Sequence, residues 1–456
     1  MGNHPNILKK IKSIYILRLT FSLIRTNKKL SFTKYNKDLK KKLNIDISNY
    51  KNLLIFDLIL TEESSDKHQK IKFINFDKDF DIEKQIKLGN LDIYCMNNNK
   101  RININENYLN EKNFGKKIKI IINNENNTIK SFKRTFYNIN ILKEISIKYD
   151  NCSIRNFKQM FNFCIKLISI TFNLYNVNPK NMSYMFGECL LLKSIHGISE
   201  WKTLKNTNFK SIFSGCESLE YLPDISKWDT SGAKNLSFLF SRCCSLKQLP
   251  DISRWNIDNA TEMEYMFYEC KTLKSLDFTK FKTNYIKDMS NMFNGCYSLI
   301  SLDLKNWNIP NIININEMFK GCIQLQTIEL SNNFKSENVR YISSMFNGCS
   351  NLTSLDLSFF DTKNVENMNS VFANCSSLTK LDNNFRTDKA ITLKKMFYSC
   401  ESLSQLYLKY FDTSKIDNSG LDSVFDNCTK LNLFIDVDKC SNLVNLIPKY
   451  VNITDI

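Results

Sequence analysis

Two spacings of apolar residues alternate along most of this chain, and residues 349–375 show both. In the stretch LTSLDLS, Leu355 and Leu357 alternate with Ser354 and Asp356. Side chains that alternate with a period of two point to opposite faces of an extended chain. The stretch therefore predicts a short strand with one buried face and one outward face.

The next segment, NVENMNSVFANC, has a different spacing. Val365, Met368, Phe372 and Cys375 fall at positions i, i+3, i+7 and i+10. These positions share one face of a helix of about three turns. Asn and Thr residues precede the segment, as helix caps do. The spacing predicts a short amphipathic helix.

A cysteine marks the same place in every copy of this unit. Eleven cysteines lie 25 to 28 residues apart, and each has Phe three residues before it and Leu three residues after it. They are Cys164, Cys189, Cys216, Cys243, Cys270, Cys296, Cys322, Cys349, Cys375, Cys400 and Cys428. A twelfth, degenerate copy has Ile139 in the cysteine position, between Phe136 and Leu142. A self-similar period of this length is typical of a solenoid.

Stacking explains why the unit is repeated. One strand and one helix cannot bury an apolar face alone, whereas stacked copies can. The strands would form a parallel sheet at a spacing of about 4.8 Å. Helices are wider, about 10 Å across, so they would fan out on the other side and curve the stack. We expect the strands to line the concave face.

The repeat also resembles a known family. Copies such as DMSNMFNGCYSLISLDL and ENVRYISSMFNGCSNLTSLDLSFFDT are similar to the BspA-type leucine-rich repeat, with the pattern MFxGCxSLxSLDLSxFDT, over about residues 118–435. That family has repeats of about 26 residues and occurs in surface and interaction proteins. The expected fold is an α/β leucine-rich-repeat solenoid, a horseshoe of about twelve repeats with a parallel β-sheet on one side and short helices on the other, plus a small N-terminal module.

Three explanations could account for the repeated cysteine: a disulfide ladder, a metal site or a packing position. Cysteines on neighbouring helices should lie beyond the Cα distance of about 7 Å that a disulfide allows. A zinc site needs converging thiolates or imidazoles at close spacing, and the chain has three histidines and one adjacent pair, Cys243–Cys244. We predict a buried packing role, no metal and no cofactor. Unpaired thiols also suit a reducing compartment.

One acidic residue occupies the outward strand position in five consecutive repeats. This acidic row comprises Asp277, Asp303, Glu329, Asp356 and Asp382. Carboxylates stacked about 5 Å apart repel one another unless a basic partner shares the field. The row is thus a candidate docking surface for a protein partner with a basic segment. The alternative is a solvated consensus residue of the LDLS stretch. Pro223 and Pro250 hold the same position in two earlier repeats.

The positive charge of the chain is concentrated at its beginning. Residues 1–50 hold 12 Lys and Arg against 2 Asp and Glu, a net charge of +10 out of +17. Nucleic-acid binding by the whole chain therefore gains little support. The segment predicts two short basic amphipathic helices, which are similar in placement to an F-box that recruits a ubiquitin-ligase core. A cap on the stack and a contact with a membrane surface are the alternatives.

These patterns divide the chain into four parts. We predict a basic helical segment at 1–50, a small β-rich cap at 51–117, the repeats at 118–435 and a C-terminal cap or tail at 436–456. The alternating stretches NLLIFDLIL, KIKFINF and LDIYCM support the β-rich cap.

Function is expected to lie in binding. The sequence has no G-x-G-x-x-G, P-loop, H-E-x-x-H or G-x-S-x-G motif, so we expect no enzyme. We expect a non-catalytic scaffold that binds a protein through the repeat surface. The alternatives are an F-box-like substrate adaptor of a ubiquitin ligase and a surface adhesin. No secretory signal or membrane span is recognisable, which favours an intracellular, cytoplasmic protein over one at the cell surface.

Overall fold

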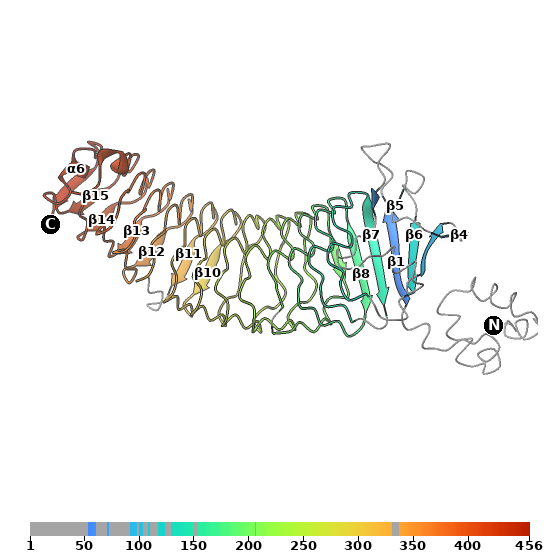
Figure 1. The fold of residues 1–456 in the computed structure, drawn as a ribbon. Coiled ribbons are helices and arrows are strands. Elements are labelled where there is room, and N and C mark those ends of the chain that lie inside the picture. Colours follow the sequence, from blue (N-terminus) through green and yellow to red (C-terminus); the bar gives the residue numbers. More distant parts are fainter. Residues whose placement is uncertain are drawn as a thin grey trace, which may run out of the picture.

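The structure is a computed structural model of the chain. It describes residues 53–60, 71–72, 92–97, 100–103, 108–109, 117–123, 129–149, 153–205, 207–330 and 337–456. From residue 129 onward the chain winds into coils, one for each sequence repeat, that stack in a single gently curved row with the C-terminus at one end (Figure 1). The predicted leucine-rich-repeat solenoid is confirmed.

A seven-stranded sheet begins the described part of the stack. Its order is β4-β3-β6-β1-β7-β8-β9. The strands are β1 (Leu53–Leu60), β3 (Asp92–Asn97), β4 (Lys100–Asn103), β6 (Lys117–Asn123), β7 (Leu142–Tyr149), β8 (Ser169–Leu174) and β9 (Ser194–His196). The pairings from β4 to β7 are antiparallel, and those from β7 to β9 are parallel. β2 (Ile71–Lys72) and β5 (Tyr108–Leu109) form a separate antiparallel pair.

Later coils each contribute one short strand to parallel sheets. These are β10 (Ser301–Leu304), β11 (Thr327–Leu330), β12 (Ser354–Leu357), β13 (Lys380–Asn383), β14 (Gln405–Leu408), β15 (Asn432–Ile435) and β16 (Asn452–Asp455). In β12, Leu355 and Leu357 are buried and Ser354 and Asp356 are exposed, as the alternation predicts. Each parallel pair of repeat strands keeps the register of the sequence repeat, with Leu355 opposite Leu381.

Three coils in the middle of the stack, between β9 and β10, have no strand among their described residues. In two of these coils the outward strand position is Pro223 or Pro250. A proline has no N–H to donate to a ladder, so it weakens the pairing of its own strand with a neighbour. At the strand position of the two proline coils, the described residues keep one parallel bridge, between Tyr221 and Gln248.

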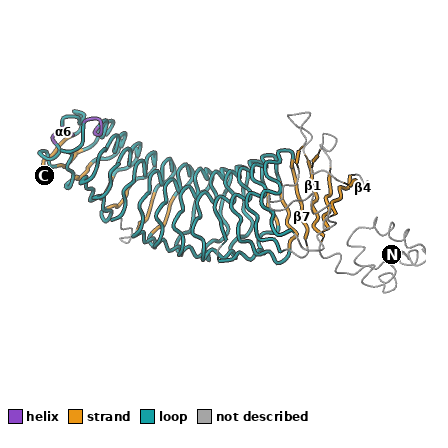
Figure 2. The backbone as a smooth tube through the Cα atoms, viewed as in Figure 1, coloured by secondary structure: helices purple, strands orange, loops and turns teal. Residues whose placement is uncertain are grey.

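The prediction of a short helix in each repeat is wrong. Tight turns occupy these segments instead. Figure 2 shows the coils mainly as loops and turns, with helix drawn only near the C-terminal end. Within 365–375, Ser370 and Asn374 have φ of 56° and 62°, values that no right-handed helix accommodates. Alternate N–H groups bond to the next coil, as in Phe372 N–H to Met396 O at 2.9 Å. The described helical elements are a 3₁₀ turn, η3 (Asn418–Leu421), and α6 (Ser441–Val444).

The same turn geometry recurs in all twelve predicted copies. Residues five and one before the cysteine position have positive φ in every copy, from Arg134 and Asn138 in the first to Ser423 and Asn427 in the last. The apolar residues at i, i+3, i+7 and i+10 still face inward, because successive turns of three to four residues have nearly the period of a helix. The amphipathic pattern therefore predicts the buried face correctly, although its backbone is different.

Stacked rings fill the core between the coils. The Phe that stands three residues before each cysteine lies nearly parallel to its counterparts in the neighbouring coils. Phe319 and Phe346, for example, have centroids 5.4 Å apart and planes 10° apart. The column runs from Phe136 to Phe425. All four tryptophans are buried as well. Apolar burial of this extent is the main stabilising contribution to such a stack.

Candidate functional site

The repeated cysteines form a structural column, as predicted. Each of the eleven is buried, and its thiol donates a hydrogen bond to the carbonyl of the core Phe in the preceding coil. In Cys349 the distance from Sγ to Phe319 O is 3.1 Å. Burial raises the pKa of Cys164, Cys296 and Cys375 to about 12, so these thiols keep their protons. A buried thiol that donates to a backbone carbonyl is a packing group and not a nucleophile.

Neither a disulfide nor a metal site involves these cysteines. All thirteen cysteines between Cys164 and Cys440 are free. In the described part of the chain, no group of three or more His, Cys, Asp or Glu side chains is placed to hold a metal ion. None of the described helices is long and apolar enough to span a membrane.

The acidic row lies at the outward strand position of its coils. Asp277, Asp303, Glu329 and Asp356 are exposed, and Asp382 is half-buried. The register places Asp303 directly opposite Glu329 and Asp356 directly opposite Asp382. Carboxylates on neighbouring parallel strands are about 4.8 Å apart at the backbone. The structure thus brings the acids together in pairs along the stack.

Three of the five acids also hold the turn that comes directly after them. Asp277 Oδ1 accepts hydrogen bonds from Thr279 N at 2.9 Å and from its hydroxyl at 2.7 Å. These bonds lower the pKa of Asp277. Asp303 and Asp356 each accept one bond from the N–H two residues later, at 3.0 and 2.9 Å. Such a turn stabilises the strand end through one carboxylate oxygen and leaves the charge outside.

Two lysines compensate part of the row. Lys305 forms an ion pair with Glu329, and Lys380 Nζ lies 2.8 Å from Asp382 Oδ2. Within the described residues, no Lys or Arg nitrogen lies within ion-pair distance of Asp277, Asp303 or Asp356. Asp277, Asp303 and Asp356 therefore lack a direct ion pair, although Lys280, Lys305 and Lys380 lie close enough to interact with them electrostatically.

The two coils with prolines have the same turn, but its Asp stands one residue later, directly after the proline. Asp224 and Asp251 come directly after Pro223 and Pro250, and each accepts a bond at 2.9 Å from the N–H of the serine two residues later. Hydrogen bonds from these serines lower the pKa of both carboxyls. The repeated Asp therefore has a local structural role, beyond the solvation that its outward position predicts.

An aromatic pair continues the row and was missed in the sequence. Tyr407 and Phe434 take the next two outward positions, in β14 and β15, directly opposite each other. Their rings stack with centroids 4.2 Å apart and planes 8° apart. Tyr407 is 52% exposed. The signal was available, because Tyr407 stands seven residues after Cys400, the same offset as Asp382 from Cys375.

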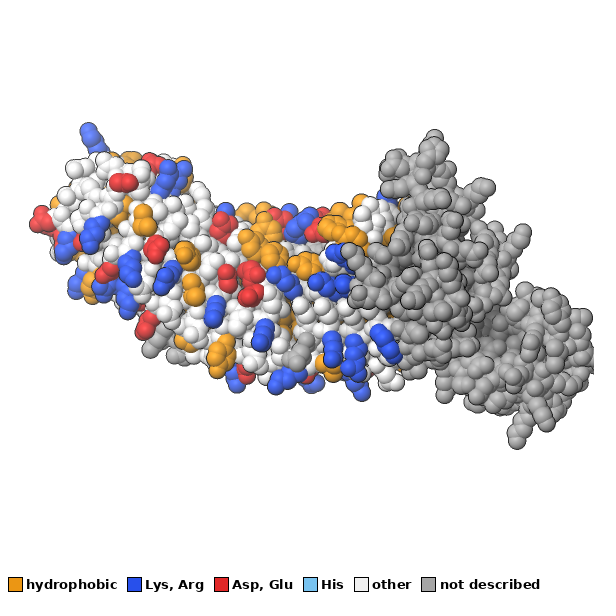
Figure 3. Space-filling view, viewed as in Figure 1, with side chains coloured by type: hydrophobic (Ala, Val, Ile, Leu, Met, Phe, Trp, Pro, Cys, Tyr) orange, Lys and Arg blue, Asp and Glu red, His pale blue; other side chains and the backbone are white. Residues whose placement is uncertain are grey.

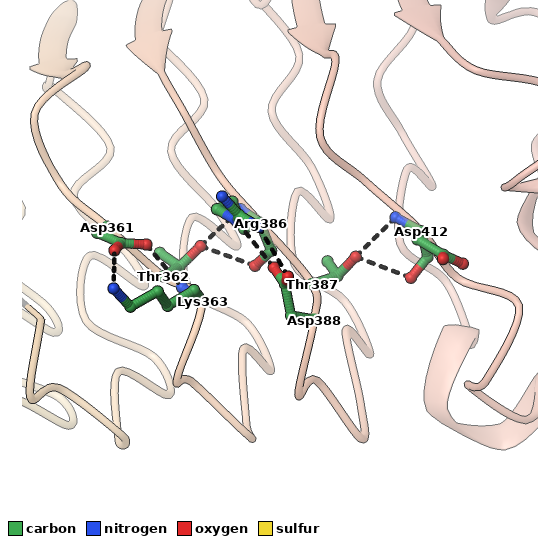
Figure 4. A network of polar contacts seen from close by, with 7 residues as sticks. All are labelled: Asp361, Thr362, Lys363, Arg386, Thr387, Asp388 and Asp412. Atoms are coloured by element: carbon green, nitrogen blue, oxygen red, sulfur yellow. Dashed lines mark hydrogen bonds and ion pairs between the residues drawn. The ribbon is translucent and has the colours of Figure 1, made fainter.

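Polar contacts between coils explain the FDT part of the repeat. The Thr362 hydroxyl donates to Arg386 O at 2.8 Å and accepts from Arg386 N at 2.7 Å (Figure 4). Thr387 makes the same pair of bonds with Asp412. Each buried threonine thus satisfies one N–H and one carbonyl of the next coil. This network is structural, since its polar atoms already form hydrogen bonds with one another.

A small polar cavity lies beside the turns in the middle of the stack. It has a volume of about 330 Å³ and is lined by Thr261, Glu262, Glu264, Lys287 and Asp288. Asp288 is already hydrogen-bonded to Ser290 and Asn314.

Figure 3 shows that Lys, Arg, Asp and Glu side chains intermingle with scattered hydrophobic ones on the visible face of the coils.

Comparison with known families gives one match. The family described as "Mycoplasma protein of unknown function, DUF285" matches residues 102–220, 180–301, 261–360, 287–411 and 342–448. These matches overlap and together span most of the chain. No curated protein matches it.

Several solved structures are similar to the chain at low sequence identity, and two of them are described as leucine-rich-repeat proteins. A leucine-rich repeat protein from Eubacterium ventriosum is 17% identical, with 58% of this chain and 86% of that chain covered and a TM-score of 0.30. An LRR protein from Leptospira interrogans is 14% identical, with coverages of 64% and 89% and a TM-score of 0.19. The Toll–Spätzle complex of Drosophila contains a chain that is 15% identical, with coverages of 66% and 42% and a TM-score of 0.24.

Proposed function

The chain belongs to the DUF285 family, and we propose that it is a non-catalytic scaffold that binds another protein through the strand face of its leucine-rich repeats. The acidic row carries this proposal. It is a line of carboxylates in neighbouring coils, three of which have no ion-pair partner among the described residues. A rigid stack that holds like charges in line favours a partner with complementary positive charge.

The rest of the described surface supports binding over catalysis. The repeated thiols are buried and donate to backbone carbonyls, and the repeated hydroxyls bridge the coils. Neither set is placed as a nucleophile beside a base. We assign the repeat to the BspA type because of its MFxGCxSLxSLDLS pattern. We also propose an intracellular location, since a column of thiols that act as donors requires reduced sulfur.

The F-box-like interpretation concerns a part of the chain outside the described residues. It needs residues 10–45 to recruit a ligase core, and the part of the chain before residue 53 is not described. The same holds for contact of residues 1–50 with a membrane surface. The proposed scaffold depends on neither, because it places the binding face in residues 277–382.

A charge test can separate binding from the structural role of the row. Asparagine keeps the side-chain oxygen that ends the strand but removes the charge, so Asp303→Asn with Asp356→Asn should leave the fold intact. Lysine at both positions removes the turn bond and reverses the charge. We expect the Asn pair to capture less of the protein partners than wild type does, and the Lys pair to capture none.

The measurement is quantitative affinity capture with mass spectrometry, using wild type, both double variants and the control Glu337→Gln. Glu337 is exposed and lies outside the strand face. Thermal unfolding followed by circular dichroism checks that each variant is folded. Equal capture by wild type and the folded Lys pair would overturn the acidic row as the binding surface.

A further inference from the structure

The outward side chains change in chemistry after Asp382, and this change narrows the kind of partner that would fit. In the next two coils the outward position is occupied by Tyr407 and Phe434 instead of an acid. We propose that this strand face binds an extended protein segment in which basic residues are followed by an aromatic or large aliphatic residue. This proposal rests on the proposed function.

The aromatic pair has the exposure of a binding platform. Tyr407 keeps 52% of its surface exposed, although its ring stacks on Phe434 at 4.2 Å. A pair of rings that only closed the core would be covered, as the Phe column is. Stacked rings at the edge of a surface offer a rigid apolar contact that loses little conformational entropy on binding.

The charge of the same face provides the second half of the site. Asp303 and Asp356 each present a carboxylate with one oxygen in the turn and no hydrogen bond to the other among the described residues. Lys380 pairs with Asp382, the acid next to the aromatic pair. The acid nearest the rings is therefore paired, whereas Asp303 and Asp356 have no direct ion pair among the described residues, and the face is acidic at one part and apolar at the other.

Distances set the length of the segment. Five coil-to-coil steps separate Asp277 from Tyr407, and two of them are paired strands. At the 4.8 Å spacing of paired strands, five steps correspond to about 24 Å. An extended chain covers this span in about seven residues at 3.3 Å each. A segment of six residues rich in Lys and Arg, followed by Trp and Leu, matches both parts of the face at once.

Fluorescence anisotropy with three labelled eight-residue peptides tests the order of the two parts. The first has four Lys or Arg among its first six residues and ends in Trp-Leu. The second has the same composition with Trp in the middle, and the third ends in Ser-Ser. Wild type should bind the first about 3- to 10-fold more tightly than the other two, as one aromatic contact contributes.

Two sets of variants identify the residues. Tyr407→Thr with Phe434→Thr keeps residues suited to strands and should remove the preference for the first peptide without changing binding of the third. Tyr407→Thr alone serves if the double variant unfolds. Asp303→Asn with Asp356→Asn should weaken the first and third peptides alike by about threefold at low salt, and not at high salt.

The outcomes separate the two proposals. Equal affinity of wild type for all three peptides, or an unchanged preference in the folded Tyr407 variant, overturns the aromatic part of the site. If the Asp303→Asn/Asp356→Asn variant binds every peptide as wild type does, the acidic row is not the binding surface, and the proposed function is overturned as well.

Discussion

Replacing one ring in the Phe column tests the account of what holds the coils together. Phe346 is fully buried, and its centroid lies 5.4 Å from that of Phe319 and 5.6 Å from that of Phe372. Truncation of a buried Phe to Ala costs about 3–5 kcal/mol in the free energy of unfolding. About 1–3 kcal/mol of this corresponds to the two ring contacts, at about 0.5–1.5 kcal/mol each.

The loss should be local as well as large. Each coil of a solenoid contacts only its neighbours, so Phe346→Ala weakens two adjacent interfaces in the middle of the stack. We expect urea unfolding to begin at lower concentration and to lose its single cooperative step. Hydrogen exchange measured by mass spectrometry should show faster exchange in residues 337–380 than in residues 160–220.

A matched control shows whether the ring or its position matters. Tyr285 is also aromatic and lies in a coil, but its side chain is 58% exposed. Tyr285→Ala should change the free energy of unfolding by no more than about 0.5 kcal/mol. If Phe346→Ala costs less than about 1 kcal/mol, or exchange rises equally in all coils, the column is not the main contact between coils.

Three further predictions concern the turns and the thiols. Gly348→Ala should cost about 1–2 kcal/mol, because φ is 78° there. Gly215→Ala should cost a similar amount, because φ is 76° there and the Glu188 carboxyl, 2.7 Å from the new Cβ, ends a flexible side chain that can move away; urea unfolding compares the two variants. Iodoacetamide should modify the partly exposed Cys244 in the folded protein while the buried column reacts only after unfolding, as peptide mass spectrometry would show; early labelling of the column contradicts this. The lowered pKa of Asp277 stabilises the fold above about pH 4, the ordinary range of an Asp carboxyl, and this contribution is lost as pH falls through the folded value. Asp277→Asn should therefore reduce the loss of stability between about pH 5 and pH 3 in urea titrations, and an unchanged pH profile would contradict the assignment.

The helical interpretation of the turn segment shows where a pattern stops being informative. Val365, Met368, Phe372 and Cys375 are buried as a helix face would bury them. The difference lies in residues such as Ser370, whose positive φ no hydrophobic spacing reveals. One clue was present, because Gly stands immediately before Cys349 and in the same position of three other copies. Glycine in that position is typical of a left-handed turn.

The candidate surface divides in the same way. The outward position of the acidic row is predicted by the alternation in LDLS and is where the structure places Asp303 and Asp356. The turn bond from the N–H two residues later cannot be predicted from alternation, because it depends on how the strand ends. Tyr407 carries no charge, so only its place in the repeat connects it to the acids.

Repetition alone determined the number of copies, the buried residues, the outward strand residues and the packing role of the cysteine. Identical units bury identical positions, whatever backbone joins them. The backbone of the turns was decided only in three dimensions. A turn whose N–H groups bond alternately within the coil and to the next coil is stable only when the next coil is present. A single repeat contains no information about that partner, so the choice between helix and stacked turns belongs to the tertiary structure.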